Sequence, residues 1–207
     1  MLLDFTAAVN IMALSAVAVF AISGALDAAR QKMDILGFML IGTATGLGGG
    51  TLRDILLGNL PVFWIREPVW ILICLVASGA TFFIASKLAS LTRTLLWMDA
   101  VGLALFAAVG TQISLKYGAP SLIAVCMGVM SATFGGICRD VLCGSNLTLM
   151  NEELYITTAV AGSSVYLAFD LLGFPNSYSL IAGFIVAFSL RALAIIYNIK
   201  LPNPYRH

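Results

Sequence analysis

The feature that most constrains the fold of this chain is a series of long apolar segments joined by short connections. A transmembrane helix needs about 20 consecutive apolar residues, whereas a membrane-spanning strand would alternate in hydrophobicity. These runs are continuous and rich in Ala, Leu and Gly. The sequence therefore predicts one all-α integral membrane domain over residues 1–207. We place its seven transmembrane helices at 6–29, 34–58, 68–86, 97–115, 120–144, 154–170 and 178–199.

Composition supports a lipid environment and argues against several classes of function. Only 10% of the residues are charged and 60% are hydrophobic, whereas soluble proteins carry about 25% charged residues. The net charge of +1 offers no basic surface, so we expect a lipid bilayer and not nucleic acid as partner. The sole histidine is the terminal His207, and no catalytic triad, metal cluster or nucleotide loop is evident. We expect no enzyme activity, no metal and no cofactor.

The orientation follows from lysines and arginines in short loops, which favour the cytoplasmic side. Two such residues fall on one side of the predicted helices, namely Arg66 and Lys116. Seven fall on the other side, namely Arg30, Lys32, Lys87, Arg93, Arg191, Lys200 and Arg206. The bias predicts a multi-pass protein of the cell inner (plasma) membrane, with the N-terminus outside and the C-terminus in the cytoplasm.

An internal repeat is the most specific signal in the sequence. A shift of 86 residues aligns GGGTLRDILLG (48–58) with FGGICRDVLCG (134–144). The same shift superposes Phe20 on Phe106, Gly24 on Gly110, Gly42 on Gly128, and Glu67 on Glu153. Three helices are an odd number, so the second copy must enter the membrane from the opposite side, as in many transporters. We expect inverted repeats at 6–90 and 92–176, followed by an extra helix at 178–199. A duplicated packing unit without transport is the alternative.

The glycines of the repeated motif share one helix face with its arginine. Small residues allow helices to pack closely in membranes. Consecutive glycines also lose about 1 kcal/mol each of helix propensity, so the run can loosen or kink the helix beside a cavity. Both interpretations stay open. The candidate pore or kink residues are Thr45, Gly48, Gly49, Gly50, Thr51, Ser131, Thr133, Gly135 and Gly136.

Charged residues within the predicted helices form the second group of candidates. Adjacent residues point about 100° apart on a helix, so we expect Arg53 and Arg139 to pair with something other than Asp54 and Asp140. Each arginine is either a structural clamp or part of a gated path, because ionisable groups in spans usually face the bundle interior. Two further acids either attract cations to a mouth or are solvated interface residues, namely Asp27 and Asp99.

Because it carries two copies of the motif GG-x-x-RD-x-x-x-G, the chain resembles the prokaryotic branch of the trimeric intracellular cation (TRIC) channel family. This family is also called the glycine-transporter domain family. The pattern W-x-D-x-x-G-L-A-x-F is also present, at Trp97, Asp99, Gly102 to Ala104 and Phe106. The second copy departs from the first in reading Phe134 where the first has Gly48. The glycine kink is therefore expected to differ between the halves.

The resemblance implies a homotrimer with one pore per subunit, between the second and fifth helices and their neighbours. It also implies kinked second and fifth helices and permeation of monovalent cations, mainly potassium. The family carries a second proposed activity, transport of glycine, whose carboxylate would need a partner such as Arg53 or Arg139. A cation path past two arginines requires neighbouring acids to neutralise them. We favour the channel over the glycine carrier, and a membrane scaffold without transport is the third possibility.

Overall fold

The computed structural model describes residues 2–88, 90–145 and 154–199. Five of its helices are long and apolar enough to cross a membrane by length and composition, and α4 and α8 have 17 residues each, within the range for a span. Within the described residues all regular structure is helical. The helices are α1 (Leu2–Arg30), α2 (Ile35–Leu56), α3 (Phe63–Arg66), α4 (Val69–Ala85), α5 (Leu91–Lys116), α6 (Ser121–Cys143), α8 (Tyr155–Leu171) and α9 (Asn176–Tyr197).

The seven long helices confirm the predicted all-α fold. Two details differ from the prediction, the start of α5 and a short helix between α2 and α4. Helix α5 begins at Leu91 instead of residue 97, because the Ser90 hydroxyl caps it by accepting a hydrogen bond from the Arg93 amide. This first turn is polar, so hydropathy alone does not reveal it. The short helix α3 was not expected, and it lies in the connection between α2 and α4.

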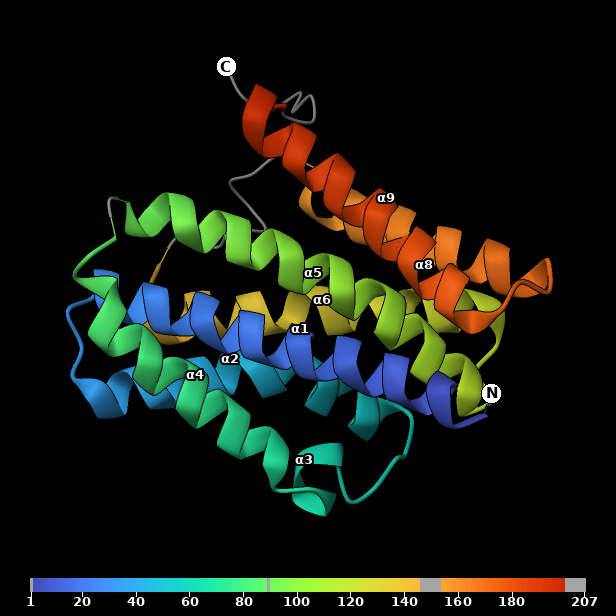
Figure 1. The fold of residues 1–207 in the computed structure, drawn as a ribbon, viewed down its shortest axis with the longest axis horizontal. Helices are drawn as coiled ribbons and strands as arrows, with labels where there is room; N and C mark the ends of the chain where they lie inside the picture. Colours follow the sequence, from blue (N-terminus) through green and yellow to red (C-terminus); the bar gives the residue numbers. More distant parts are fainter. Residues whose placement is uncertain (1, 89, 146–153, 200–207) are drawn as a thin grey trace.

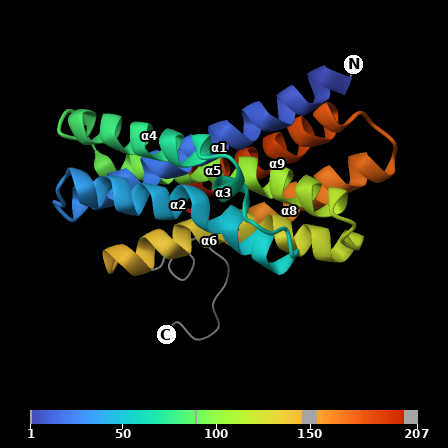
Figure 2. The same ribbon diagram turned by 90° about the horizontal axis from the view of Figure 1, so that it is seen from below.

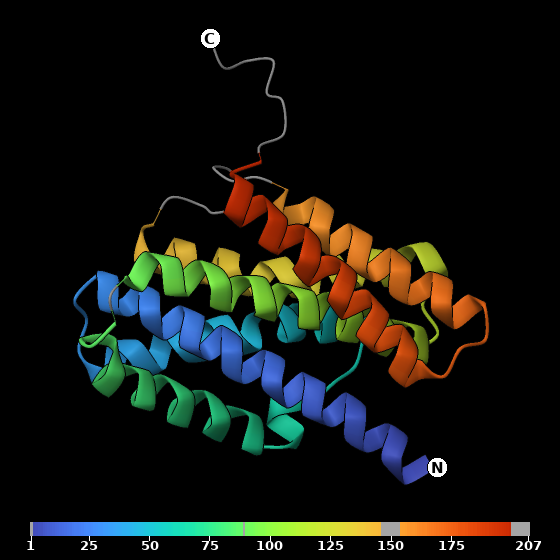
Figure 3. The same cartoon turned by 45° about the horizontal axis from the view of Figure 1, so that its top comes forward.

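The two halves of the chain run in opposite directions through the bundle. Figure 1 shows α1 running from right to left and α5 from left to right across the centre. Helices α2 and α6 are opposed in the same way. Figure 2 shows the same bundle from below, and in Figure 3 the pair α8 and α9 lies on one side of the centre while α4 lies on the other. This arrangement confirms an inverted pair of three-helix units with α9 as the additional helix.

Equivalent residues of the two units meet in the middle of the bundle. The rings of Phe20 in α1 and Phe106 in α5 stack with centroids 5.2 Å apart. Both side chains are buried, and they pack in a core with Val17, Leu47 and Leu103. Because the 86-residue shift superposes Phe20 on Phe106, this stack lies where the pseudo-two-fold axis relates α1 to α5.

Helices α2 and α6 also pack through equivalent glycines. A Cβ added at Gly49 would overlap the carbonyl oxygen of Ser131, and one added at Gly135 would stand 2.5 Å from the carbonyl oxygen of Thr45. Each helix thus presents a glycine to a backbone carbonyl of the other, and both helices are continuous through their glycines. Close packing of α2 against α6 therefore leaves no room for a side chain at Gly49 or Gly135.

The loop charges follow the predicted distribution in part. Lys32 and Lys87 lie at the end of the bundle where α1 finishes. Arg191, however, is fully buried within α9 and lies over the ring of Tyr155, 5.0 Å from its centroid. It is therefore wrongly counted among the loop charges. Lys200, Arg206 and Glu153 fall outside the described residues.

Candidate functional site

The candidate hydroxyl residues lie between α2, α6 and their neighbours, and most of them bond to their own helix. Thr45 donates to the Ile41 carbonyl oxygen at 2.7 Å, and Thr51 and Thr133 make equivalent bonds one turn back. Thr51 also accepts a hydrogen bond from the indole of Trp64. Ser131 is fully buried, and its hydroxyl has no partner among the described residues.

The remaining candidate glycines, Gly48, Gly50 and Gly136, face side chains. Gly48 lies opposite the Cys138 thiol, from which an added Cβ would stand 3.3 Å, a tight contact with a side chain. Gly50 lies against the ring of Phe63, and its equivalent Gly136 lies against the hydroxyl of Tyr155. Substitution at these three glycines would thus meet side chains first, whereas Gly49 and Gly135 contact backbone.

A cavity of about 310 Å³ opens at the end of the bundle where α2 and α5 finish. Val17 and Phe106 line it on the side of the central aromatic stack, and Gly50 and Arg53 line it from α2. Further charged residues border it, namely Arg66, Glu67 and Lys116. The cavity therefore joins the centre of the bundle to a mouth with charges of both signs.

Arg53 pairs with its neighbour, contrary to the sequence prediction. Its Nε and Nη2 donate to Oδ1 of Asp54 at 3.0 and 2.7 Å. The other oxygen of Asp54 accepts the backbone N–H of Phe63 at 3.0 Å, which holds α3 over the cavity. The prediction fails because the long arginine side chain folds back along the helix, so the 100° between adjacent Cβ directions does not separate the charged ends.

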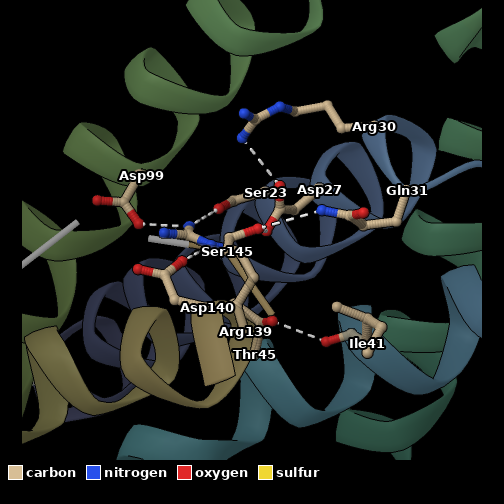
Figure 4. A network of polar contacts seen from close by, with 10 residues as sticks. All are labelled: Ser23, Asp27, Arg30, Gln31, Ile41, Thr45, Asp99, Arg139, Asp140 and Ser145. Carbon is tan, nitrogen blue, oxygen red and sulfur yellow. Dashed lines mark hydrogen bonds and ion pairs between the residues drawn. The ribbon is translucent and has the colours of Figure 1, made fainter. Parts of the chain in front are cut away.

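Arg139 is the centre of a larger network at the opposite end of the bundle. Its Nε donates to Asp140 at 2.8 Å, so here too the neighbouring acid is a partner. Its Nη1 donates to Asp99 at 2.7 Å and to the hydroxyl of Ser23 at 2.6 Å. All four side chains are buried. Helices α1, α5 and α6 are thus joined by one guanidinium, as Figure 4 shows.

Asp27 extends this network to the surface. One of its carboxylate oxygens pairs with Arg30 at 3.0 Å, and the other accepts a hydrogen bond from Ser145 at 2.9 Å. Gln31 reaches the same serine hydroxyl at 3.4 Å. Asp27 is 1% exposed, so it is a buried partner within the network and not the solvated interface residue of one alternative. We call this set the Arg139 cluster: Ser23, Asp27, Arg30, Gln31, Asp99, Arg139, Asp140 and Ser145.

The structure brings the predicted charges together in two groups and adds residues that sequence reasoning missed. Ser23, Ser145 and Asn59 were not singled out, although the 86-residue shift superposes Asn59 on Ser145. Asn59 accepts hydrogen bonds from Arg66 and from the hydroxyl of Tyr117. Applying the shift to polar residues beyond the glycine motif would have found this pair.

The described residues offer no group of three or more His, Cys, Asp or Glu side chains arranged to hold a metal ion. Three of the four thiols lie in packed surroundings: Cys74 and Cys143 are buried and Cys138 is half-buried, while Cys126 is exposed on α6. The chemistry available at the two ends is therefore that of ion pairs and charge-assisted hydrogen bonds.

Comparison with known proteins agrees with this geometry. The family model described as Glycine transporter matches residues 10–86 and again residues 96–170. The inner membrane protein YadS of Escherichia coli K12, from the group UPF0126, is 37% identical over 188 residues, which are 90% of this chain and 91% of that protein.

Solved structures of channels are similar along nearly the whole chain. The TRIC trimeric intracellular cation channel orthologue from Rhodobacter sphaeroides is 45% identical with a TM-score of 0.90, covering 92% of this chain and 98% of its own. A second TRIC cation channel, solved to explain conductance, is 33% identical with a TM-score of 0.84, covering 96% and 98%. These solved relatives are ion channels and not enzymes. The chain therefore belongs to the TRIC channel family, the family whose sequence model is described as Glycine transporter.

Proposed function

We propose that this protein is a channel for monovalent cations, mainly potassium, which assembles as a homotrimer with one pore in each subunit. The observation that carries the proposal is the similarity to the trimeric cation channel orthologue of Rhodobacter sphaeroides, at 45% identity and a TM-score of 0.90. The similarity covers 92% of this chain, so it includes both ends of the bundle and the central packing. Within this proposal the two repeats extend over residues 6–90 and 92–176.

The resemblance implies a pore between the second and fifth helices, α2 and α6, and their neighbours. Because α2 and α6 are in close contact at Gly49 and Gly135, we place the pathway between the neighbouring helices α1 and α5, flanked by α2 and α6. Along α1, Val17 lines the cavity and Ser23 belongs to the Arg139 cluster. Phe20 lies between them and stacks on Phe106, which also lines the cavity. In this conformation the aromatic stack separates the two ends, so conduction requires the stack to move aside.

The buried charges give the pathway its proposed gates. In the Arg139 cluster Asp27, Asp99 and Asp140 contribute three carboxylates against Arg30 and Arg139. This excess of acid favours cations at that end, because opposite charges attract strongly where water is scarce. We propose that the ion pairs of Arg139, and that of Arg53 with Asp54 at the other end, hold the closed arrangement and rearrange on opening.

Reconstitution into planar bilayers tests the channel directly. Purified protein should give discrete potassium currents, and native mass spectrometry should give the mass of three chains. Phe106→Leu should increase the current, because a smaller side chain widens the central constriction. Phe169→Leu, in α8, is the matched control, since the ring of Phe169 contacts that of Phe174 and Phe169 is not among the residues that line the cavity. Equal currents from these two variants would argue against a path through the stack, and absence of current from well-folded trimers would reject the channel.

Glycine transport is the second candidate, favoured by the description of the family model. The cavity is closed by the aromatic stack and bordered by both Glu67 and Lys116, as a carrier open to one side would require. A carrier would show saturable uptake of labelled glycine into vesicles without discrete currents. Measuring both on one preparation separates the two functions, and a scaffold would show neither.

A further inference from the structure

We propose that the cavity beside Arg53 is a binding site for small carboxylates, amino acids included. The inference deepens the proposed function, because the cavity is the mouth of the proposed pathway. It rests on a comparison of the two ends of the bundle. Residues related by the 86-residue shift occupy equivalent places at these ends, and the end beside Arg53 keeps the bases but lacks two of the acids.

The first difference concerns the two equivalent arginines. The Nε of Arg139 donates a hydrogen bond to Asp140, and its Nη1 donates to Asp99 and Ser23. The Nε and Nη2 of Arg53 both donate hydrogen bonds to the neighbouring Asp54. Among the contacts of the described residues, Nη1 of Arg53 has no acceptor, although the arginine is only 4% exposed and lines the cavity. A guanidinium donor is thus available there.

The residues that would satisfy this donor are replaced by apolar ones. The shift relates Asp99 to Ala13 and Ser23 to Val109. Both Ala13 and Val109 line the cavity. The cavity therefore occupies the place that the carboxylate of Asp99 and the hydroxyl of Ser23 take at the other end.

Lys116 is a second base that lacks the acid found beside its counterpart in the other half. Arg30 pairs with Asp27 at 3.0 Å. The shift relates Arg30 to Lys116 and Asp27 to Ile113, and both Lys116 and Ile113 line the cavity. Within the described part of the chain Lys116 has no ion pair. Two positive groups, Arg53 and Lys116, thus border one cavity at positions whose counterparts face carboxylates.

The surrounding framework shows that the two ends are comparable in detail. Gln31 contacts Ser145 at one end, and the equivalent pair at the other end is Tyr117 and Asn59, with the tyrosine hydroxyl 2.7 Å from the amide oxygen. Both ends thus have a hydrogen bond at this place, although the donor and acceptor groups differ. The absence of the two acids is therefore a local difference between two otherwise equivalent arrangements.

The chemistry of the cavity selects a small carboxylate as ligand. Arginine binds carboxylates through charge-assisted hydrogen bonds, and a ligand carboxylate would replace that of Asp99. The volume of about 310 Å³ is at the lower limit for ligand pockets, about 300 Å³. Glu67 and the Oε1 atom of Gln112, which is buried without a partner among the described residues, also line the cavity. These acceptors suit the ammonium group of an amino acid.

Equilibrium binding to the purified trimer tests the site without requiring transport. Melting temperature is measured against sodium acetate or glycine, with sodium chloride at the same ionic strength as the reference. We expect saturable stabilisation of the wild type. Lys116→Gln should weaken it by about tenfold or more, since it removes one charged hydrogen bond. Lys87→Gln, which removes an exposed lysine at the other end, should leave it unchanged.

Ala13→Asp provides a reciprocal test, because it installs a carboxylate at the position equivalent to Asp99. We expect this variant to lose the response to acetate and glycine by supplying Arg53 with an internal partner. Stabilisation by chloride equal to that by acetate would overturn the proposal, and so would acetate binding that Lys116→Gln leaves intact. Because the melting temperature reports binding without requiring transport, a protein that acetate stabilises but that passes no current would reject the channel and keep this site.

Discussion

Gly49→Ala is the substitution for which the structure predicts the clearest effect. The Cβ of alanine at this position would overlap the carbonyl oxygen of Ser131 and stand 2.9 Å from its carbonyl carbon. An ordinary contact begins at 3.4 Å, so the contact with the carbonyl carbon alone requires α2 and α6 to separate by about 0.5 Å, and the overlap with the oxygen requires more. Backbone atoms cannot rotate away as a side chain can, so the strain must be relieved by moving a helix.

The magnitude follows from comparison with the neighbouring Gly48. Alanine gains about 1 kcal/mol of helix propensity over glycine at either position. At Gly48 the tightest contact of the added Cβ is the Cys138 thiol, at 3.3 Å, and the backbone of Gly135 lies at an ordinary 3.7 Å. A shift of this side chain by a few tenths of an ångström relieves the contact, so Gly48→Ala should keep most of that gain. At Gly49 overpacking costs about 1–3 kcal/mol. Since the propensity gain cancels between the variants, Gly49→Ala should be less stable than Gly48→Ala by about 1–3 kcal/mol.

Unfolding of the purified trimer in detergent, followed by tryptophan fluorescence, measures this difference. The expected order of stability is Gly48→Ala at or above wild type, and Gly49→Ala below both. The stability of Gly135→Ala should be similar to that of Gly49→Ala, because its added Cβ would stand 2.5 Å from the Thr45 carbonyl oxygen. A Gly49→Ala protein as stable as Gly48→Ala would refute the close packing of the two helices.

Three further predictions concern the charges, the aromatic stack and the topology. Arg139→Gln should destabilise the protein by about 3–5 kcal/mol, because it leaves buried carboxylates unpaired. Arg53→Gln should lower the free energy of unfolding by less, because Arg53 lies beside the cavity. Chemical unfolding of both variants measures the difference. Phe106→Ala should cost about 3–5 kcal/mol as a truncation in the core, and a cost below that of Phe184→Ala in the same assay would contradict the central place of the stack. In right-side-out vesicles, external protease should remove a tag from the N-terminus and spare one at the C-terminus, and cleavage at both ends would exclude an odd number of spans.

The sequence determined the membrane fold and its symmetry, because both follow from local or periodic properties. Long apolar runs need a lipid environment whatever they pack against. The repeated motif around Arg53 and Arg139 implied inversion, since three helices reverse the direction of the chain. The equivalence of Phe20 and Phe106 also follows from the 86-residue shift, whereas their stacking requires both residues to lie beside the pseudo-two-fold axis, which the structure shows.

Only the tertiary structure decided which partners the buried charges take. Arg53 pairs with Asp54 despite their divergent directions on the helix, because the flexible side chain can fold back. The tertiary structure also decided which glycines contact backbone, since adjacent positions such as Gly48 and Gly49 face different neighbours. The sequence pattern cannot separate them, because it records spacing along one helix and not the distance to the next. The cavity beside Arg53 likewise depends on contacts among α1, α2 and α5, where apolar residues of two distant segments stand in place of acids.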